Sequence, residues 1–210
     1  YNKQFNYSRI NNLAASLATG EYLLFLNNDT EVLEPSWLRE LVSIAQRNNT
    51  GAVGAKLLYP NGLVQHAGVI VGLGGPAGHA FNKSPSDHSG YFGLLNVIKN
   101  CSAVTSACMM TKRRPFELVH GFDEKFNMAY GDVDFCLRLR EAGFFIVYTP
   151  YAVLRHQESA TRLDLSPVED SNYFIKKWQR LFLRGDPYYN PNLTLLRADY
   201  SLISKESSIR

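Results

Sequence analysis

The chain of 210 residues, with 45% hydrophobic and 20% charged residues, has the length and composition of one globular domain that buries its own core. Its 22 basic and 19 acidic residues give a net charge of +3, and their scatter along the sequence argues against nucleic acid as a partner. The three cysteines form no C-x-x-C pair, which argues against a disulfide framework and indicates a reducing cytoplasm.

The N-terminal part of the chain predicts a helix followed by a strand. Apolar residues between Ile10 and Ala18 recur at helical spacing after Ser8, a suitable N-cap, and Gly20 ends the pattern. The continuous apolar run at 22–26 predicts a strand that is buried on both faces.

Strands and helices continue to alternate along the rest of the chain. The predicted elements are a helix at 35–45, strands at 52–58 and 68–71, a loop at 72–94, a strand at 101–110, helices at 115–119 and 132–142, strands at 144–149 and 151–154, a helix around 175–181 and an irregular tail from 186. This alternation predicts a layered α/β domain.

Two groups of polar and acidic residues stand where predicted strands end or helices begin, which is where open α/β sheets bind ligands. Asn27, Asn28 and Asp29 follow the first strand, and Asp29 either helps to hold a divalent cation or caps a turn. Asp132 and Asp134 open a helix and point in different directions. We expect one of them to face a cleft, as a general base would, and the other to cap the helix.

Three histidines are candidates for the same pocket. His156, with Glu158 close behind it, follows the last predicted strand. It is a metal ligand, a proton carrier or an ordinary loop residue. His66 and His79 flank a glycine-rich stretch, and they either line the pocket or form buried hydrogen bonds.

Several segments, taken in order, carry a resemblance that covers nearly the whole chain. They lie at 5–12, 20–31, 54–62, 65–69, 121–124, 132–143, 149–152, 156–159 and 186–193. Together they resemble the family 2 glycosyltransferases of the GT-A fold, in particular bacterial enzymes of surface-polysaccharide and O-antigen assembly. The resemblance implies a mixed sheet flanked by helices, the metal and acceptor portion of one domain over 1–210, with a core at 1–160 and a C-terminal helix and tail at 161–210.

The resemblance also implies roles for individual residues. The segment 27–29 matches the family's Asp-x-Asp motif, which binds Mn²⁺ or Mg²⁺ and the diphosphate of a nucleotide-sugar donor. Because asparagine stands at the first position of the motif, Asp29 is expected to be its main metal ligand. His156 matches a histidine that often completes the metal site. Asp132 matches the catalytic base of inverting members, although Gly131 stands where the wider family usually has glutamate.

The function implied is inverting, metal-dependent, non-processive transfer of a sugar from a nucleotide sugar to a glycan or lipid-linked oligosaccharide. The Gln-x-x-Arg-Trp motif of processive synthases is absent from the sequence. The expected location is the cytoplasm, including the inner face of the membrane. Two alternatives are a fragment that only binds the acceptor glycan and an inactive scaffold.

Members of the family begin with a βαβ half that holds the nucleotide, and nothing in this sequence corresponds to it. We therefore expect this chain alone to be marginally stable and nearly unable to bind nucleotide sugars. We also expect it to associate with itself or with another chain through the face nearest residues 1–30, because an unpaired strand edge promotes association.

Overall fold

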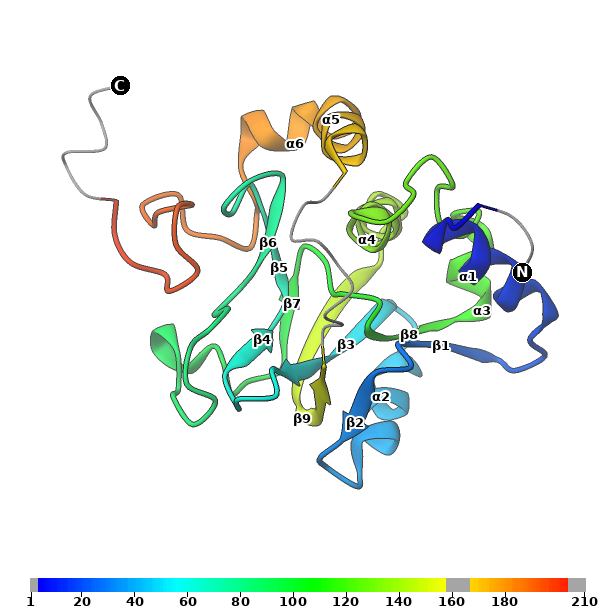
Figure 1. Ribbon diagram of the computed structural model, residues 1–210, viewed down its shortest axis with the longest axis horizontal. Helices are drawn as coiled ribbons and strands as arrows, with labels where there is room; N and C mark the ends of the chain where they lie inside the picture. Colours follow the sequence, from blue (N-terminus) through cyan, green and yellow to red (C-terminus); the bar gives the residue numbers. More distant parts are fainter. Residues whose placement is uncertain (1–3, 158–166, 204–210) are drawn as a thin grey trace.

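A mixed seven-stranded sheet organises the residues that the computed structural model describes, 4–157 and 167–203 (Figure 1). Its strands run in the order β1 (Tyr22–Leu26), β8 (Cys108–Lys112), β3 (Thr50–Leu58), β9 (Phe145–His156) and β2 (Thr30–Val32). β4 (Val64–His66) pairs with β3, and β7 (Lys99–Cys101) pairs with β9. β3 is parallel to β9 and antiparallel to β8. β5 (Val69–Val71) and β6 (Ala77–His79) form a separate hairpin.

Helices cover both faces of this sheet (Figure 1). α2 (Trp37–Ala45) packs on one face and α4 (Gly131–Glu141) on the other. Adjacent residues of β3 show the two faces, because Ala52 belongs to the core under α4 and Val53 to the core under α2. The other helices are α1 (Tyr7–Leu17), α3 (Arg113–Leu118), α5 (Val168–Lys177), α6 (Gln179–Arg184) and the 3₁₀ turn η1 (Tyr91–Gly93). The predicted α/β fold, a mixed sheet flanked by helices, is confirmed.

The first helix and strand differ in detail from their predictions. Asn6, not Ser8, is the N-cap of α1, because its side-chain oxygen accepts a hydrogen bond from Arg9 N at 2.7 Å. β1 lies at one edge of the sheet. Leu23 and Phe25 are buried, but Leu26 is 43% exposed, so the prediction of burial along the whole strand was wrong at its end.

Several predicted boundaries were wrong for physical reasons. The strand predicted at 101–110 is two strands, β7 and β8, separated by a loop at 102–107. The strands predicted at 144–149 and 151–154 are one strand, β9. Pro150 lies there within a bulge, since the partner of Ala55 is Thr149 and that of Lys56 is Val153. The helix predicted around 175–181 ends at Trp178, where α6 begins.

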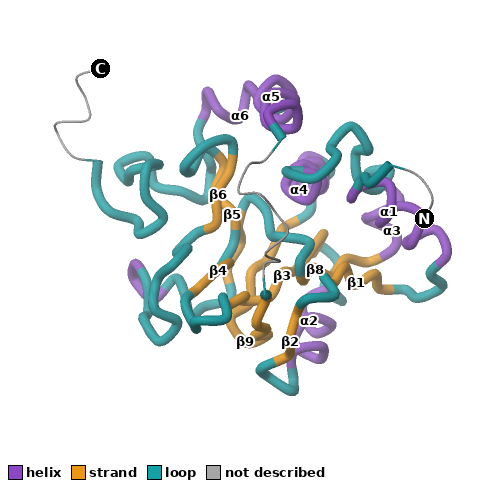
Figure 2. Tube along the Cα trace, in the orientation of Figure 1, coloured by secondary structure: helices purple, strands orange, loops and turns teal. Residues whose placement is uncertain are grey.

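The segment that follows α6 is drawn as loop and packs on the β5–β6 hairpin (Figure 2). Asp186 is buried and its Oδ2 accepts a hydrogen bond from Val71 N at 2.8 Å. Gly74 N donates to Leu195 O at 2.8 Å. The loop predicted at 72–94 therefore contains β6 and is fixed by the tail.

Two global features of the described chain bear on its setting. Cys101, Cys108 and Cys136 are free and buried, as the absence of a disulfide framework predicted. Of the helices in the described ranges, none combines the length and apolar character needed to cross a lipid bilayer.

Candidate active site

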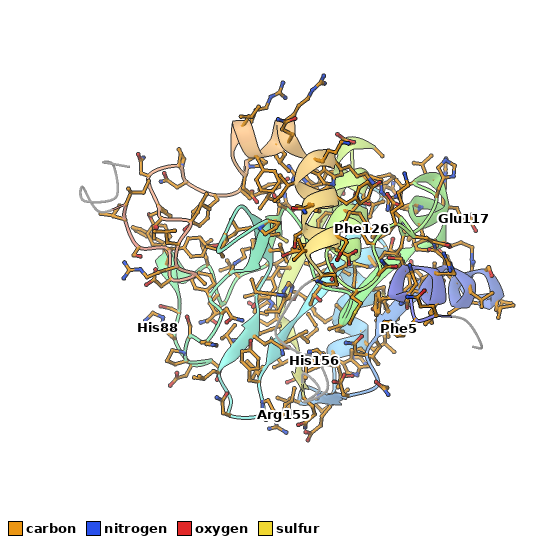
Figure 3. All side chains as sticks on the ribbon, turned by 45° about the horizontal axis from the view of Figure 1, so that its top comes forward. Phe5, His88, Glu117, Phe126, Arg155 and His156 are labelled. Atoms are coloured by element: carbon orange, nitrogen blue, oxygen red, sulfur yellow. The ribbon has the colours of Figure 1, made fainter. Side chains whose placement is uncertain are left out.

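A cavity of about 310 Å³ opens where β1 and β9 end and α4 begins, with the β5–β6 hairpin on its far wall. Its lining includes Asn27, Gln65, His79, Asp132 and His156. His156 lies near the centre of the view in Figure 3. The structure thus gathers one residue from each of the two predicted polar groups, and two of the three candidate histidines, around one space.

The short strand β2 brings Asp29 to His156. Thr30 pairs with His156 in the antiparallel register of β2 and β9, and Gln157 N donates to Asp29 O at 2.9 Å. Asp29 Oδ1 consequently lies 3.1 Å from His156 Nε2. Asn27 Nδ2 lies at the same distance, 3.1 Å, from that nitrogen. Asn28 is exposed, and Glu158 lies outside the described residues.

The chemistry of these donors fits a divalent cation. The Oε1 atom of Gln65 lies 2.8 Å from His156 Nδ1, and an amide oxygen only accepts, so Nδ1 carries the hydrogen. Asn27 Nδ2 is a donor 3.1 Å from Nε2, so Nε2 offers its lone pair beside the Asp29 carboxylate, an arrangement that a cation between them stabilises. No third His, Cys, Asp or Glu joins the pair within the described ranges, so water and phosphate oxygens would fill the remaining coordination positions.

Asp132 lies in the first turn of α4, with Tyr130 as the N-cap residue at φ 60°. Asp132 is thus not the residue of the Asp132 and Asp134 pair that caps the helix. Its Oδ2 accepts hydrogen bonds from Ser106 N at 3.0 Å and from Ser106 Oγ at 3.4 Å. Asp132 is therefore a carboxylate that is fixed by the β7–β8 loop at the wall of the cavity.

Glycine at position 131 has a steric cause. A Cβ atom there would lie 2.8 Å from Ser8 Oγ and 3.4 Å from Phe126 Cβ, and the first distance is shorter than real Cβ contacts allow. A side chain at position 131 would thus require Ser8 to move.

Asp134 points away from the cavity into the core. Its side chain is fully buried, with Oδ2 accepting from Arg138 Nε at 2.8 Å and Oδ1 from Trp178 Nε1 at 2.9 Å. Lys177 Nζ lies 2.7 Å from the same Oδ1. The prediction that one carboxylate of this pair faces a cleft is confirmed for Asp132, whereas the expected capping role of Asp134 was wrong.

The two remaining histidines form a hydrogen-bonded pair. His66 is fully buried, and its Nε2 accepts from Gly68 N at 3.3 Å, so its Nδ1 carries the hydrogen and donates to His79 Nδ1 at 2.7 Å. His79 lines the cavity. Each of the two sequence-based alternatives thus holds for one histidine: His66 is buried and His79 faces the pocket.

We expect His66 to make stability depend on pH. Burial lowers the pKa of its imidazole well below 6.5, and His79 and Lys99 lower it further by like-charge repulsion. Below about pH 6.5 the unfolded chain then binds more protons than the folded chain. The free energy of unfolding therefore decreases as the pH is lowered below that value, by at most about 1.4 kcal/mol per pH unit. The variant His66→Asn, which keeps a short polar side chain, should show a flatter pH dependence of the urea midpoint between about pH 5 and 6.5. Equal slopes for the two proteins would contradict this assignment.

Two residues of the site were missed at the level of sequence. Gln65 stands beside His66 in a segment that carried the resemblance, but its partner His156 is 91 positions away in sequence. Ser106 fell inside a predicted strand, although it lies in the loop that positions Asp132. Neither residue type carries a functional signal by itself.

Comparisons with known proteins agree with this architecture. The model of the family described as glycosyl transferase family 2 matches residues 2–118. The O-antigen biosynthesis protein RfbC of Myxococcus xanthus is 49% identical over 94% of this chain, and the chain spans only 16% of the length of RfbC.

Two solved structures share the fold at low identity. GalNAc-T7 with UDP, GalNAc and Mn²⁺ superposes with a TM-score of 0.59 at 12% identity, over 85% of this chain and 36% of that one. The mannosyltransferase PcManGT of Pyrobaculum calidifontis with GDP-Man and Mn²⁺ gives 0.53 at 14% identity, over 84% and 49%. The fold is thus of the GT-A type, and the chain belongs to glycosyl transferase family 2.

Proposed function

We propose that this chain contributes the metal site, the catalytic base and the acceptor side of an inverting, non-processive glycosyltransferase. The reaction would transfer one sugar from a nucleotide sugar to a glycan or lipid-linked oligosaccharide. The observation that carries this proposal is that one cavity is lined by both His156 and the fixed carboxylate of Asp132. Asp29 does not line the cavity itself, but its Oδ1 lies 3.1 Å from His156 Nε2.

The residues divide the proposed chemistry among them. Asp29 and His156 would hold a divalent cation, which when bound supplies positive charge against the departing diphosphate. Asp132 would accept the proton of the acceptor hydroxyl as that oxygen attacks the anomeric carbon from the side opposite the leaving group. The Ser106 hydrogen bonds to Oδ2 keep the carboxylate oriented toward the cavity. A single displacement of this kind inverts the anomeric configuration.

The relatives support the proposal by what they are named for. RfbC is an O-antigen biosynthesis protein, and the two GT-A structures contain Mn²⁺ with UDP or GDP-Man. Because this chain spans less than a fifth of RfbC, the activity of the whole protein is part of the proposal. The division into a core at 1–160 and a tail at 161–210 also stays a prediction.

The partners and location belong to the same proposal. The outer edge of β1 lacks a strand among the described residues, and exposed leucines lie on α1 and at the end of β1: Leu13, Leu17 and Leu26. These features support association through the N-terminal face, with a second copy or another chain. We place the reaction in the cytoplasm, at the inner membrane face for a lipid-linked acceptor, a setting that suits three free thiols.

Replacing Asp29 by alanine tests the metal assignment. We expect the natural protein to lose Mn²⁺-dependent sugar transfer while it keeps its fold, because Asp29 contributes one of the two facing ligands and no buried contact of the core. Transfer of radiolabelled sugar across a Mn²⁺ titration measures this loss. The matched control is Glu31→Ala, which removes an exposed carboxylate two residues away whose ion pair is with Arg155. If Asp29→Ala shows the same dependence of sugar transfer on Mn²⁺ as wild type, the metal site is refuted and the alternative of an acceptor-binding fragment is favoured.

A further inference from the structure

Gln65 is held rigidly in the middle of β4, and its side chain is 5% exposed. The backbone on either side is paired, since Val64 N donates to Ser84 O at 2.8 Å and His66 aligns with Leu57 of β3. Asn82 Nδ2 donates to Gln65 O at 3.0 Å. A residue fixed on both sides in this way presents its side-chain amide at a defined place in the cavity wall.

The amide of Gln65 meets the ring of His156 on the side away from Asp29. Its Oε1 lies 2.8 Å from Nδ1, while Nε2 on the opposite side of the ring lies 3.1 Å from Asp29 Oδ1. A neutral imidazole carries one hydrogen, on either Nδ1 or Nε2, and the hydrogen-bond partner of one nitrogen decides the state of the other.

The two tautomers have opposite consequences for a cation. With the hydrogen on Nδ1, Nε2 offers a lone pair toward the carboxylate, and a cation can bind both atoms. With the hydrogen on Nε2, the ring donates to Asp29 Oδ1 directly, and the two ligands satisfy each other. Oε1 of Gln65 accepts at Nδ1, 2.8 Å away, and the amide N–H of Asn27 donates toward Nε2 at 3.1 Å, so both contacts favour the first state.

We propose that Gln65 is a positioning residue that keeps the Asp29–His156 pair open to a divalent cation by fixing the tautomer of His156. This inference rests on the proposed function, because it takes that pair to be the metal site. It assigns a function to a residue that acts on the metal site through His156.

The test compares two variants of Gln65 in the natural protein. Gln65→Met keeps the side chain's length and removes the acceptor, so Mn²⁺ affinity should fall about 10–100-fold. Gln65→Glu keeps an acceptor oxygen and should retain affinity within about threefold of wild type. Electron paramagnetic resonance of Mn²⁺ alone, titrated into each protein, gives the dissociation constants. The control on the same strand is His66→Asn. This variant should bind Mn²⁺ as wild type does, because the side chain of His66 contacts His79 and not His156.

A second readout needs no metal and no activity. The ¹⁵N chemical shifts of His156 at pH 8, where an ordinary imidazole is neutral, should report the Nδ1–H form in wild type and in Gln65→Glu. Gln65→Met should show a shift toward the Nε2–H form. If Gln65→Met does not fold, Gln65→Asn replaces it, because one methylene less withdraws the amide oxygen from Nδ1.

The outcomes separate this inference from the metal site itself. Wild-type Mn²⁺ affinity or an unchanged tautomer in the variants without the acceptor would overturn the role of Gln65. A protein that binds no Mn²⁺ although its His156 shows the Nδ1–H form would overturn the proposed metal function, and with it the purpose assigned to Gln65. Loss of affinity in Gln65→Met with retention in Gln65→Glu supports both.

Discussion

Replacing Asp132 by asparagine is expected to lower kcat for sugar transfer by a factor of about 10²–10⁴, the usual contribution of general-base catalysis. The amide oxygen of asparagine can still accept the hydrogen bond from Ser106 N, which lies 3.0 Å from Oδ2 in the native protein. It cannot take a proton from the acceptor hydroxyl. Donor binding should therefore be nearly unchanged, and steady-state kinetics with calorimetric titration of the nucleotide sugar would separate the two effects.

The control for this variant is Ser106→Ala, which removes only the longer of the two hydrogen bonds to Asp132, from Oγ at 3.4 Å. Its backbone N–H remains, so we expect a smaller effect on kcat than in Asp132→Asn. A fall in kcat of less than about tenfold in Asp132→Asn would be inconsistent with a general base at this position.

Replacing Asp134 by alanine should reduce the free energy of unfolding by about 3–5 kcal/mol, the usual cost of removing one partner from a buried ion pair. The carboxylate is fully buried and accepts from Arg138, Lys177 and Trp178. Without it, the indole N–H of Trp178 loses its acceptor. Arg138 and Lys177 each lose an ion pair, although Arg138 keeps two backbone carbonyls and Lys177 keeps Asp123. Urea unfolding followed by tryptophan fluorescence would measure the change, and Trp178 itself reports on this cluster.

The stability of Asp132→Asn is the control for that of Asp134→Ala. Asp132 and Asp134 stand two residues apart on one helix turn, yet one faces the cavity and the other the core. We expect Asp132→Asn to change stability by much less than Asp134→Ala and to change kcat by much more. Two variants with equal losses of stability would show that the division of this motif into a catalytic and a structural carboxylate is wrong.

The long elements of this fold could be predicted because their patterns repeat several times. α1, α2 and α4 each present an apolar face over at least nine residues, and β3 is a nine-residue strand of mostly small and apolar residues, eight of them buried. The three-residue strands β2, β4 and β6 are too short for a periodic pattern. β2 forms because β9, more than a hundred positions later in the chain, supplies its hydrogen bonds, which local sequence does not show. β4 and β6 pair with the strands just before them in the chain, but neither is long enough to be marked by a repeated pattern.

The same limit applies to the candidate site. Asp132 could be expected at a cavity because helix starts at the edge of an α/β sheet bind ligands. The contact of Asp29 with His156 depends on β2, and the contact of His156 with Gln65 spans 91 positions. Such contacts become visible only when the sheet is assembled, which is why residue type suggested Asp29 and His156 but gave no reason to single out Gln65.

The missing side chain at position 131 also has a mechanical consequence. Ser8 Oγ lies 2.8 Å from the position of a Cβ atom at 131, so the hydroxyl of Ser8 in the first turn of α1 packs directly on the backbone of the first turn of α4. Because a packed interior transmits strain, a displacement of α1 toward α4 should shift the turn that carries Asp132. A partner bound at the proposed N-terminal face would then act on the helix turn of the proposed base through Ser8 and Gly131.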